Sequence, residues 1–482
     1  MSILDPQAAL SAKRSHVLLV NSLSAWMTAF MTSSINIALP SIQTEFGLSA
    51  VALGWLPLGY VLASAAFLLP FGRIGDHFGR RLLFLCGTIL FGLSSVALVL
   101  AGSYLPLVVF RFTQGLGAAM IFSTSMAMVT LAYPSRKRGR AMGTSVAAAY
   151  LGMTTGPIIG GAIVQNMGWR SLFLVAGCFA FFNFALDLWL LRRAEWKARR
   201  PDRSDWIGSA IWVVALSLLL IGMSWLPLAR GLTLLGVGLA VLAAFLWWES
   251  KAQSPIMVIG LFRHNRVFAF SNLTALISYG SIMGYTYLMS LYLQFIKGLN
   301  AQSAGAVLIV GVALQCLVAP LAGRLSDRID PRWLASFGMG LCTLSLLLFS
   351  FLGAHTPYWY VLLALCLLGV GYALFSPPNQ SSIMGSVDNR YVGFASANMS
   401  TMRMIGMAIS IASATVVIAL IVGRHDIQPA DYPHLLTAIR VTFGVLAGLG
   451  MLSVIASLAR GKTPEDQMVV RALGQERRPS DA

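Results

Sequence analysis

Hydrophobic residues fall into long runs that are separated by short polar segments. Runs of about 20 apolar residues are long enough to cross the hydrocarbon core of a bilayer as α-helices. The pattern predicts fourteen such spans, at residues 16–38, 51–71, 82–102, 105–131, 141–166, 171–191, 207–226, 231–248, 267–293, 303–322, 333–353, 358–376, 393–422 and 436–458. We therefore expect an all-α polytopic membrane protein.

Composition and charge agree with this architecture. The 482 residues are 57% hydrophobic and 11% charged, whereas soluble domains carry about 25% charged residues. If the N-terminus is cytoplasmic and the loops alternate, most of the 34 Lys and Arg residues lie in the cytoplasm, as the positive-inside rule requires. We expect both termini in the cytoplasm and the protein in the bacterial inner membrane. The net charge of +17 is then explained by contact with anionic lipids, and we expect no nucleic-acid partner.

A weak internal repeat divides the chain into two halves. The segment GRIGD at 72–76 returns as GRLSD at 323–327, and each copy follows the second span of a six-helix group. The expected units are an N-terminal segment (1–15), a six-helix bundle (16–191), a basic loop (192–206), an inserted helix pair (207–248), a second six-helix bundle (249–458) and a tail (459–482). Two parallel six-helix halves are typical of major facilitator transporters.

Four segments resemble the major facilitator superfamily, and within it the fourteen-span drug:proton antiporters of the EmrB/QacA type. They are GRIGDHFGRR at 72–81, NIALPSI at 36–42, RFTQG at 111–115 and GMTTGPIIGG at 152–161. The resemblance implies the major facilitator fold and multidrug-type efflux of amphipathic organic compounds by alternating access, with proton coupling. The scarcity of Asp, Glu and His within the spans leaves little from which to build a catalytic site. We therefore expect no enzyme activity, cofactor or metal, and a monomer with a small-molecule substrate.

The two charged segments are the expected gating elements. Their residues are Gly72, Arg73, Gly75, Asp76, Gly79, Arg80 and Arg81 in the first copy, and Gly323, Arg324 and Asp327 in the second. By analogy with related transporters, Asp76 would lie between the halves and favour the outward-open state. A carboxylate there can cap the start of a helix, and the span at 393–422 is the candidate.

Small residues recur in the fifth span. Gly152, Gly156 and Gly160 line one helix face, where small side chains let a second helix approach closely, and Pro157 can bend the helix. Ordinary tight packing is one interpretation. The resemblance implies instead that these residues, with Gly161, form an antiporter motif between the two halves.

A buried cation in the fourth span raises the question of coupling. Arg111 is expected to face the bundle interior, with Gln114 beside it, or to snorkel to the headgroups. The resemblance implies a proton-coupling role beside an acid in the first span, five residues before Asn36, but this chain has Met31 there. Either protons are carried by Asp187, a histidine or the substrate, or Arg111 binds an anionic or zwitterionic amphiphile such as a fatty acid, lipid or acidic metabolite.

Two other charged residues lie within predicted spans. Asp187 is alternatively an interfacial residue beside Arg192 and Arg193, and Arg403 faces either the central cavity or a loop carboxylate. Aromatic and amide side chains on the central helices suit amphipathic molecules. The candidate lining residues are Trp26, Phe30, Asn36, Trp55, Tyr60, Gln114, Tyr285, Tyr287, Gln294, Gln315, Asn379 and Gln380. Pro377 and Pro378 are expected to break their helix.

Overall fold

The structure of the chain is a computed structural model that describes residues 14–133, 135–192, 205–252, 254–326, 329–387 and 391–461, without the side chains of 135–140 and 392–393. The expected N-terminal segment, basic loop and tail therefore lie almost wholly outside the described residues. Asp327 of the second charged segment also lies outside them.

Long helices make up most of the described chain. Their bounds are α2 (Arg14–Phe46), α3 (Ala50–Phe78), α4 (Arg80–Val99), α5 (Tyr104–Ala132), α6 (Ser135–Met167), α7 (Trp169–Leu190), α8 (Trp206–Ser224), α9 (Ala229–Lys251), α10 (Ile259–His264), α11 (Arg266–Ile282), α12 (Tyr285–Leu291), α13 (Ala301–Ser326), α14 (Pro331–Phe349), α15 (Tyr358–Gly385), α16 (Val392–Ile421) and α17 (Tyr432–Ala459). Ser49, Asp205, Asn265 and Asp330 cap helix starts by accepting a backbone N–H of the first turn.

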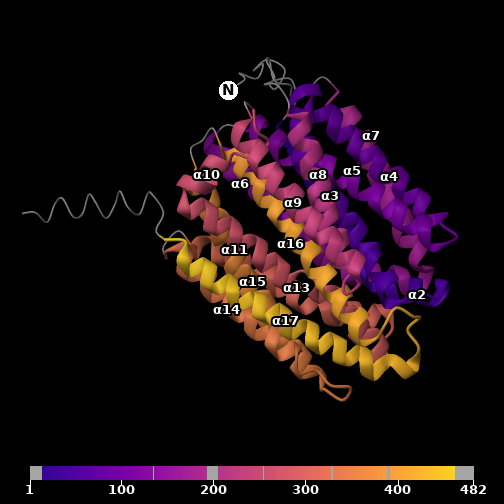
Figure 1. The fold of residues 1–482 in the computed structure, drawn as a ribbon. Coiled ribbons are helices and arrows are strands. Elements are labelled where there is room, and N and C mark those ends of the chain that lie inside the picture. Colours follow the sequence, from indigo (N-terminus) through magenta and orange to yellow (C-terminus); the bar gives the residue numbers. More distant parts are fainter. Residues whose placement is uncertain are drawn as a thin grey trace, which may run out of the picture.

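The helices form two groups that lie side by side (Figure 1). In the first group α2 packs along α6, and α5 packs along α3 and α4. In the second, α15 packs along α13 and α14, and α11 packs along α16 and α17. The groups meet where α6 contacts α13 and where α3 contacts α16.

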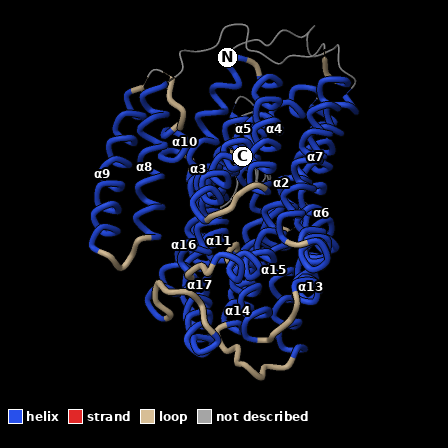
Figure 2. The backbone as a smooth tube through the Cα atoms, turned by 90° about the vertical axis from the view of Figure 1, so that its right-hand side faces the viewer, coloured by secondary structure: helices blue, strands red, loops and turns tan. Residues whose placement is uncertain are grey.

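The helices α8 and α9 pack on each other at one side of the bundle (Figure 2). Only α8 of the pair makes extensive contacts with the two groups, and it touches one helix of each, α3 and α16. This placement agrees with an inserted pair, although the exact boundaries of the expected units stay a prediction.

Within the described residues, thirteen helical segments are long and apolar enough to cross a membrane. The helix α2 is not among them because its sequence is more polar, but its 33 residues have the necessary length and lie within the first group. The all-helical architecture is confirmed, and the fourteenth span remains a prediction.

The two ends of the bundle differ in charge. We call the end where α2 begins and α17 ends the basic end (Figure 1). The name reflects the arginines near the helix ends there, which are Arg14, Arg73, Arg80, Arg324 and Arg460. We call the other end, where α2 finishes and α3 begins, the opposite end.

The first charged segment is not the loop that the sequence predicted. The helix α3 runs through it to Phe78 and α4 begins at Arg80, so that only Gly79 separates two helices. Gly79 has a φ of 121°, a conformation that a residue with a Cβ rarely adopts. The segment is therefore a rigid corner with its charges on helix ends.

The predicted span at 267–293 is interrupted in the structure. The helix α11 ends at Ile282, and α12 starts at Tyr285 and continues as a π-helix over Tyr292–Ile296. At the break, the N–H of Gly284 donates to Ser410 Oγ of α16 at 2.9 Å. A Cβ on Gly284 would lie 2.7 Å from that oxygen, so the close approach of α16 requires glycine here.

The expected break at Pro377 and Pro378 is wrong. The helix α15 continues through both prolines to Gly385. Neighbouring elements hold the segment, because Asn379 donates to the carbonyl of Ser271 at 3.2 Å and accepts from Arg460 at 3.2 Å. Helices buried in a bundle tolerate proline when such contacts satisfy nearby polar groups.

Candidate functional site

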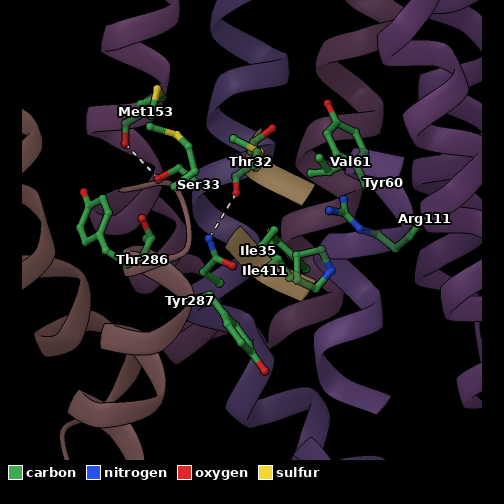
Figure 3. A pocket seen from close by; sticks show the side chains of 15 residues that line it. Thr32, Ser33, Ile35, Tyr60, Val61, Arg111, Met153, Thr286, Tyr287 and Ile411 are labelled. Atoms are coloured by element: carbon green, nitrogen blue, oxygen red, sulfur yellow. Dashed lines mark hydrogen bonds between the residues drawn. The ribbon is translucent and has the colours of Figure 1, made fainter. Parts of the chain in front are cut away.

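An enclosed pocket lies between the two helix groups (Figure 3). Its lining comes from both groups: Thr32, Ser33, Ile35, Asn36, Pro57, Tyr60, Val61, Arg111 and Met153 from the first, and Met283, Tyr285, Thr286, Tyr287, Met407 and Ile411 from the second. The cavity volume is about 40 Å³, which holds only a few water molecules. An organic substrate would therefore require the two groups to move apart.

Arg111 is the charged group of the pocket. The side chain is buried, donates from Nε to the carbonyl of Leu56 at 3.0 Å and from Nη1 to Gln114 Oε1 at 2.6 Å. Its guanidinium lies 4.7 Å from the centre of the Tyr60 ring, an arrangement that stabilises a cation. The prediction that Arg111 faces the bundle interior is confirmed, and snorkelling is wrong.

The partners that hold Arg111 are all neutral. Gln114 is itself fixed by a hydrogen bond from Nε2 to Ser95 Oγ at 2.7 Å, so it holds the Arg111 side chain in one orientation. Gln114 does not line the pocket. Among the described residues Arg111 forms no ion pair with a carboxylate. A buried cation that is solvated by dipoles alone can accept an anionic group from a ligand.

The polar residues of α2 give the pocket its other hydrogen-bonding groups. Asn36 donates to the carbonyl of Thr32 at 3.5 Å, while its Oδ1 is buried and has no hydrogen-bond partner among the described residues. Ser33 donates to the carbonyl of Met153 at 3.0 Å and so joins α2 to α6 (Figure 3). Met31 is fully buried in the core and does not line the pocket.

The interrupted helix supplies much of the second group's share of the lining. Because the chain turns at Met283 and Gly284, the side chains of Tyr285, Thr286 and Tyr287 follow one another at the pocket. Of these, the sequence had indicated Tyr285 and Tyr287 as lining residues. These are the first three residues of α12, and Thr286 was missed because the sequence predicted one uninterrupted span here.

Hydrogen bonds close the pocket toward the opposite end. Tyr287, Ser290 and Gln294 each donate to a backbone carbonyl of the first group, at 3.4, 2.5 and 3.2 Å. Gln294 was expected to line a cavity, and it lies instead in this closure.

Backbone contacts at glycines strengthen the same closure. A Cβ on Gly305 of α13 would lie 2.0 Å from the carbonyl oxygen of Pro157, and one on Gly161 would lie 2.7 Å from that of Ala301. Such close helix contacts form only where one partner lacks a side chain. Pro157 and Gly161 therefore lie between the halves, as the antiporter motif implies.

The three regularly spaced glycines of α6 have a different neighbour. Added Cβ atoms on Gly152, Gly156 and Gly160 would lie 2.3, 2.8 and 2.5 Å from atoms of Trp26, Ser33 and Ser34 of α2. These glycines thus pack inside the first group, and the interpretation as ordinary tight packing is correct for them. The ring of Trp26 stacks on Phe30 at 5.1 Å between the centroids and does not line the pocket.

The charges of the first gating segment pair among themselves and with neighbours. Asp76 pairs with Arg80 one turn later at 2.5 Å, and Arg73 donates to the carbonyl of Pro255 in the segment after α9. The residue that precedes α16 is Tyr391, and the expected capping of this helix by the Asp76 carboxylate stays a prediction. The role of Asp76 in gating stays a proposal.

Asp187 has a specific structural partner. Its carboxylate, fully buried, lies 2.7 Å from Nε of Arg81. The pair joins the end of α7 to the start of α4 at the basic end. Arg193 of the interfacial interpretation lies outside the described residues. Because Asp187 is remote from the lining residues and ion-paired, it is not a pocket group.

Several other predicted residues do not reach the pocket. Asn379 is held by Ser271 and Arg460, and Gly72 and Gly323 have open space beside them. Arg403 lies on α16 outside the pocket lining. No group of three or more side chains that could hold a metal ion occurs in the described part of the chain.

Comparisons with known proteins agree with this geometry. A family profile described as Major Facilitator Superfamily matches residues 22–411. The riboflavin transporter RibZ of Clostridioides difficile is 28% identical over 399 residues, 82% of this chain and 86% of that protein. Multidrug resistance protein Stp of Mycobacterium tuberculosis is 32% identical over 402 residues, which are 82% of this chain and 74% of that protein.

A solved structure has the same fold. It is a bacterial homolog of the human lysosomal transporter Spinster, in an inward-facing and unoccupied conformation. The two chains align with a TM-score of 0.66 over 94% of this chain and 99% of the other, at 17% sequence identity.

Proposed function

Because the chain belongs to the major facilitator superfamily, we propose that it exports amphipathic organic compounds by alternating access. The relatives are membrane transporters and not enzymes. One observation carries the proposal: both helix groups line the enclosed pocket, and contacts between them close it toward the opposite end. A site between two halves opens to one side or the other when the halves rock.

We assign the basic end to the cytoplasm of a bacterial cell, with the protein in the inner membrane and α2 as the fourteenth span. The positive-inside rule supports this orientation, since Arg14, Arg73, Arg324 and Arg460 lie at that end. In this orientation the conformation is closed to the exterior. Anionic lipids would bind at the basic end, and one chain would suffice for transport.

The chemistry of the pocket suits an amphipathic substrate. Tyrosine, methionine and aliphatic side chains provide apolar contacts, and Arg111 and Asn36 provide a charged and a polar group. Such a mixture orients a largely apolar molecule through a few polar contacts. The similarity to a multidrug resistance protein supports the same substrate class.

Proton coupling would act through the substrate. The lining contains no carboxylate or histidine, and the buried Asp187 already pairs with Arg81. A base that leaves its proton in the cytoplasm, crosses in its neutral form and takes up a proton outside completes a net exchange of substrate for proton without such a group. The gradient would then drive export although Met31 replaces the expected acid.

An anionic or zwitterionic amphiphile is the second candidate substrate. The observation in its favour is Arg111, whose partners among the described residues are a carbonyl, an amide and an aromatic ring. A carboxylate or phosphate would offset the cost of burying this charge better than a neutral or cationic ligand.

Transport by the purified chain in liposomes with an imposed pH gradient tests both candidates. Uptake of a cationic dye only in the presence of the gradient would support multidrug antiport. Uptake of a fluorescent fatty acid without uptake of the cationic dye would support the second candidate. Transport of neither class would contradict the proposal.

Replacement of Arg111 tests the pocket itself. We expect Arg111→Ala to abolish transport of either substrate class, because the only charge of the pocket is lost. Arg440→Ala, which removes an exposed arginine of α17, is the matched control and should retain transport. Unchanged rates in a folded Arg111→Ala protein would remove this residue from the mechanism.

A further inference from the structure

A second cation without a carboxylate lies between the pocket and the basic end. Arg403 forms no ion pair and no hydrogen bond in the described part of the chain, and its Nε is buried without a partner. Arg81 and Arg111, two buried arginines of the first group, are by contrast both held by specific acceptors. An arginine whose buried donor lacks an acceptor indicates a site that a ligand would complete.

The helical repeat of α16 places Arg403 next to the pocket on the same helix face. Met407 and Ile411 of α16 line the pocket, and Arg403 precedes them by one and two turns on the same helix face. Because α16 begins at the basic end, Arg403 lies on that side of the pocket. It is therefore on the path that joins the pocket to the basic end.

Two tyrosines occupy the corresponding positions on other helices. Tyr150 lies one turn before the lining residue Met153 on α6, and Tyr279 lies one turn before Met283 on α11. Three methionines thus form the floor of the pocket, and two tyrosines and an arginine form the next layer toward the basic end. Methionine side chains are flexible enough to let a ligand pass between them.

Contacts and electrostatic interactions link the residues of this layer into one cluster. A Cβ on Gly406, one turn after Arg403, would lie 2.7 Å from Cβ of Tyr279. The Tyr279 ring lies 6.1 Å from that of Tyr372, and Arg403 is within electrostatic range of both Tyr150 and Tyr372.

The cluster also joins the two halves. The Tyr150 hydroxyl of α6 lies 3.3 Å from Ser376 Oγ of α15, which follows Tyr372 by one turn. A ligand between Tyr150 and Arg403 would contact both halves at once.

We infer that Arg403, Tyr150 and Tyr372 form a vestibule that binds the carboxylate group of an amphipathic organic anion before it enters the pocket. The inference rests on the proposed transport function and specifies the charge of the substrate. The guanidinium supplies paired donors for a carboxylate, and the tyrosine hydroxyls supply further donors. The tyrosine rings and the methionine floor accept the apolar part, so that the ligand passes from Arg403 to Arg111.

Binding to the full-length chain in nanodiscs of phosphatidylcholine tests the inference without requiring transport. The probes are 11-(dansylamino)undecanoic acid and its methyl ester, which differ only in the carboxylate. We expect the acid to bind more tightly than the ester, and Arg403→Gln to weaken binding of the acid by about tenfold with little effect on the ester. Arg403→Lys should recover part of the affinity.

The matched control is Arg230→Gln, which removes an exposed arginine at the opposite end and should leave both affinities unchanged. Equal binding of acid and ester by the wild-type chain, or equal loss in Arg230→Gln and Arg403→Gln, would overturn the inference. Displacement of the acid by phosphatidylglycerol in the nanodisc would identify a lipid headgroup as the occupant and would also overturn it.

These outcomes separate the vestibule from the proposed function. Acid binding that depends on Arg403, in a chain that transports nothing in liposomes, would support the vestibule and contradict the transport function. If the chain transports substrate but acid binding does not depend on Arg403, the transport function would be supported and the vestibule contradicted.

Discussion

The charged side chains inside the bundle differ in how their charge is compensated. Arg81 has a buried carboxylate partner in Asp187, Arg111 has neutral dipoles and an aromatic ring, and Arg403 has no hydrogen-bonding partner among the described residues. A fully compensated charge is a structural element, whereas incomplete compensation leaves capacity for a ligand. Arg81 is therefore a structural residue, and Arg111 and Arg403 are candidate ligand-binding residues.

Asp187→Asn tests the structural role of the buried ion pair between Asp187 and Arg81. Removing one member of a buried ion pair leaves the other charge without compensation, and we expect a loss of about 3–5 kcal/mol in stability. Thermal unfolding in lipid nanodiscs measures this loss. Asp76→Asn, which breaks the solvent-exposed pair with Arg80, is the control and should cost about 0–1 kcal/mol. An Asp187→Asn protein of normal stability whose transport no longer responds to pH would instead indicate a proton carrier.

At the scale of elements, glycines decide which helix faces meet. The regular spacing on α6 predicts a smooth face, and the structure shows that this face packs on α2 within the first group. The contact with α13 uses Pro157 and Gly161, which lie outside the regular series. Spacing alone indicates that a close helix contact exists but does not identify the second helix, because a face of small side chains fits any neighbouring helix.

Substitution of Gly152 tests this assignment. In Gly152→Ala the new Cβ would lie 2.3 Å from the carbonyl oxygen of Trp26, so α2 and α6 must separate. We expect a loss of about 1–3 kcal/mol, seen as a lower midpoint of thermal unfolding. Gly143→Ala on the same helix meets no atom within 4 Å and should be neutral. A neutral result for both variants would contradict the packing.

At the scale of the whole molecule, a set of close contacts holds the two helix groups together between the pocket and the opposite end. Hydrogen bonds from Ser290 and Gln294 and the contact of Gly305 with Pro157 lie there. Opening to that side must break all of them together. Such a set of contacts makes a two-state element, whose equilibrium a substitution can shift.

Gly305→Ala should shift the equilibrium toward the state that is open at the opposite end. The added Cβ would lie 2.0 Å from the carbonyl oxygen of Pro157, so the closed contact cannot form without displacement. Spin labels on cysteines that replace Ser103 and His355, one in each group at that end, should show an added population at longer distance. Gly448→Ala, which has open space on α17, is the control. Identical distance distributions for both variants would contradict the expectation.

Long-range packing accounts for the parts of the site that the sequence did not predict. Asn36, Tyr60, Tyr285 and Tyr287 were expected to line a cavity and do so. Thr286 and the three methionines were not expected, because methionine has no pattern that separates a pocket floor from a core and because Thr286 reaches the pocket only through the break at Gly284. Asn379 was wrongly expected there, since its partner Arg460 comes from the far end of the chain.

The sequence by itself determined the all-helical membrane architecture, the approximate positions of the helices and the resemblance to a transporter family. These properties follow from apolar runs, charge asymmetry and local motifs, which act over short stretches of chain. Only the tertiary structure decided that Asp187 pairs with Arg81 and that Arg403 lies on the basic-end side of the pocket with no hydrogen-bond partner among the described residues. Both depend on which helix faces meet across hundreds of residues, and the periodicity of one helix does not specify its neighbour.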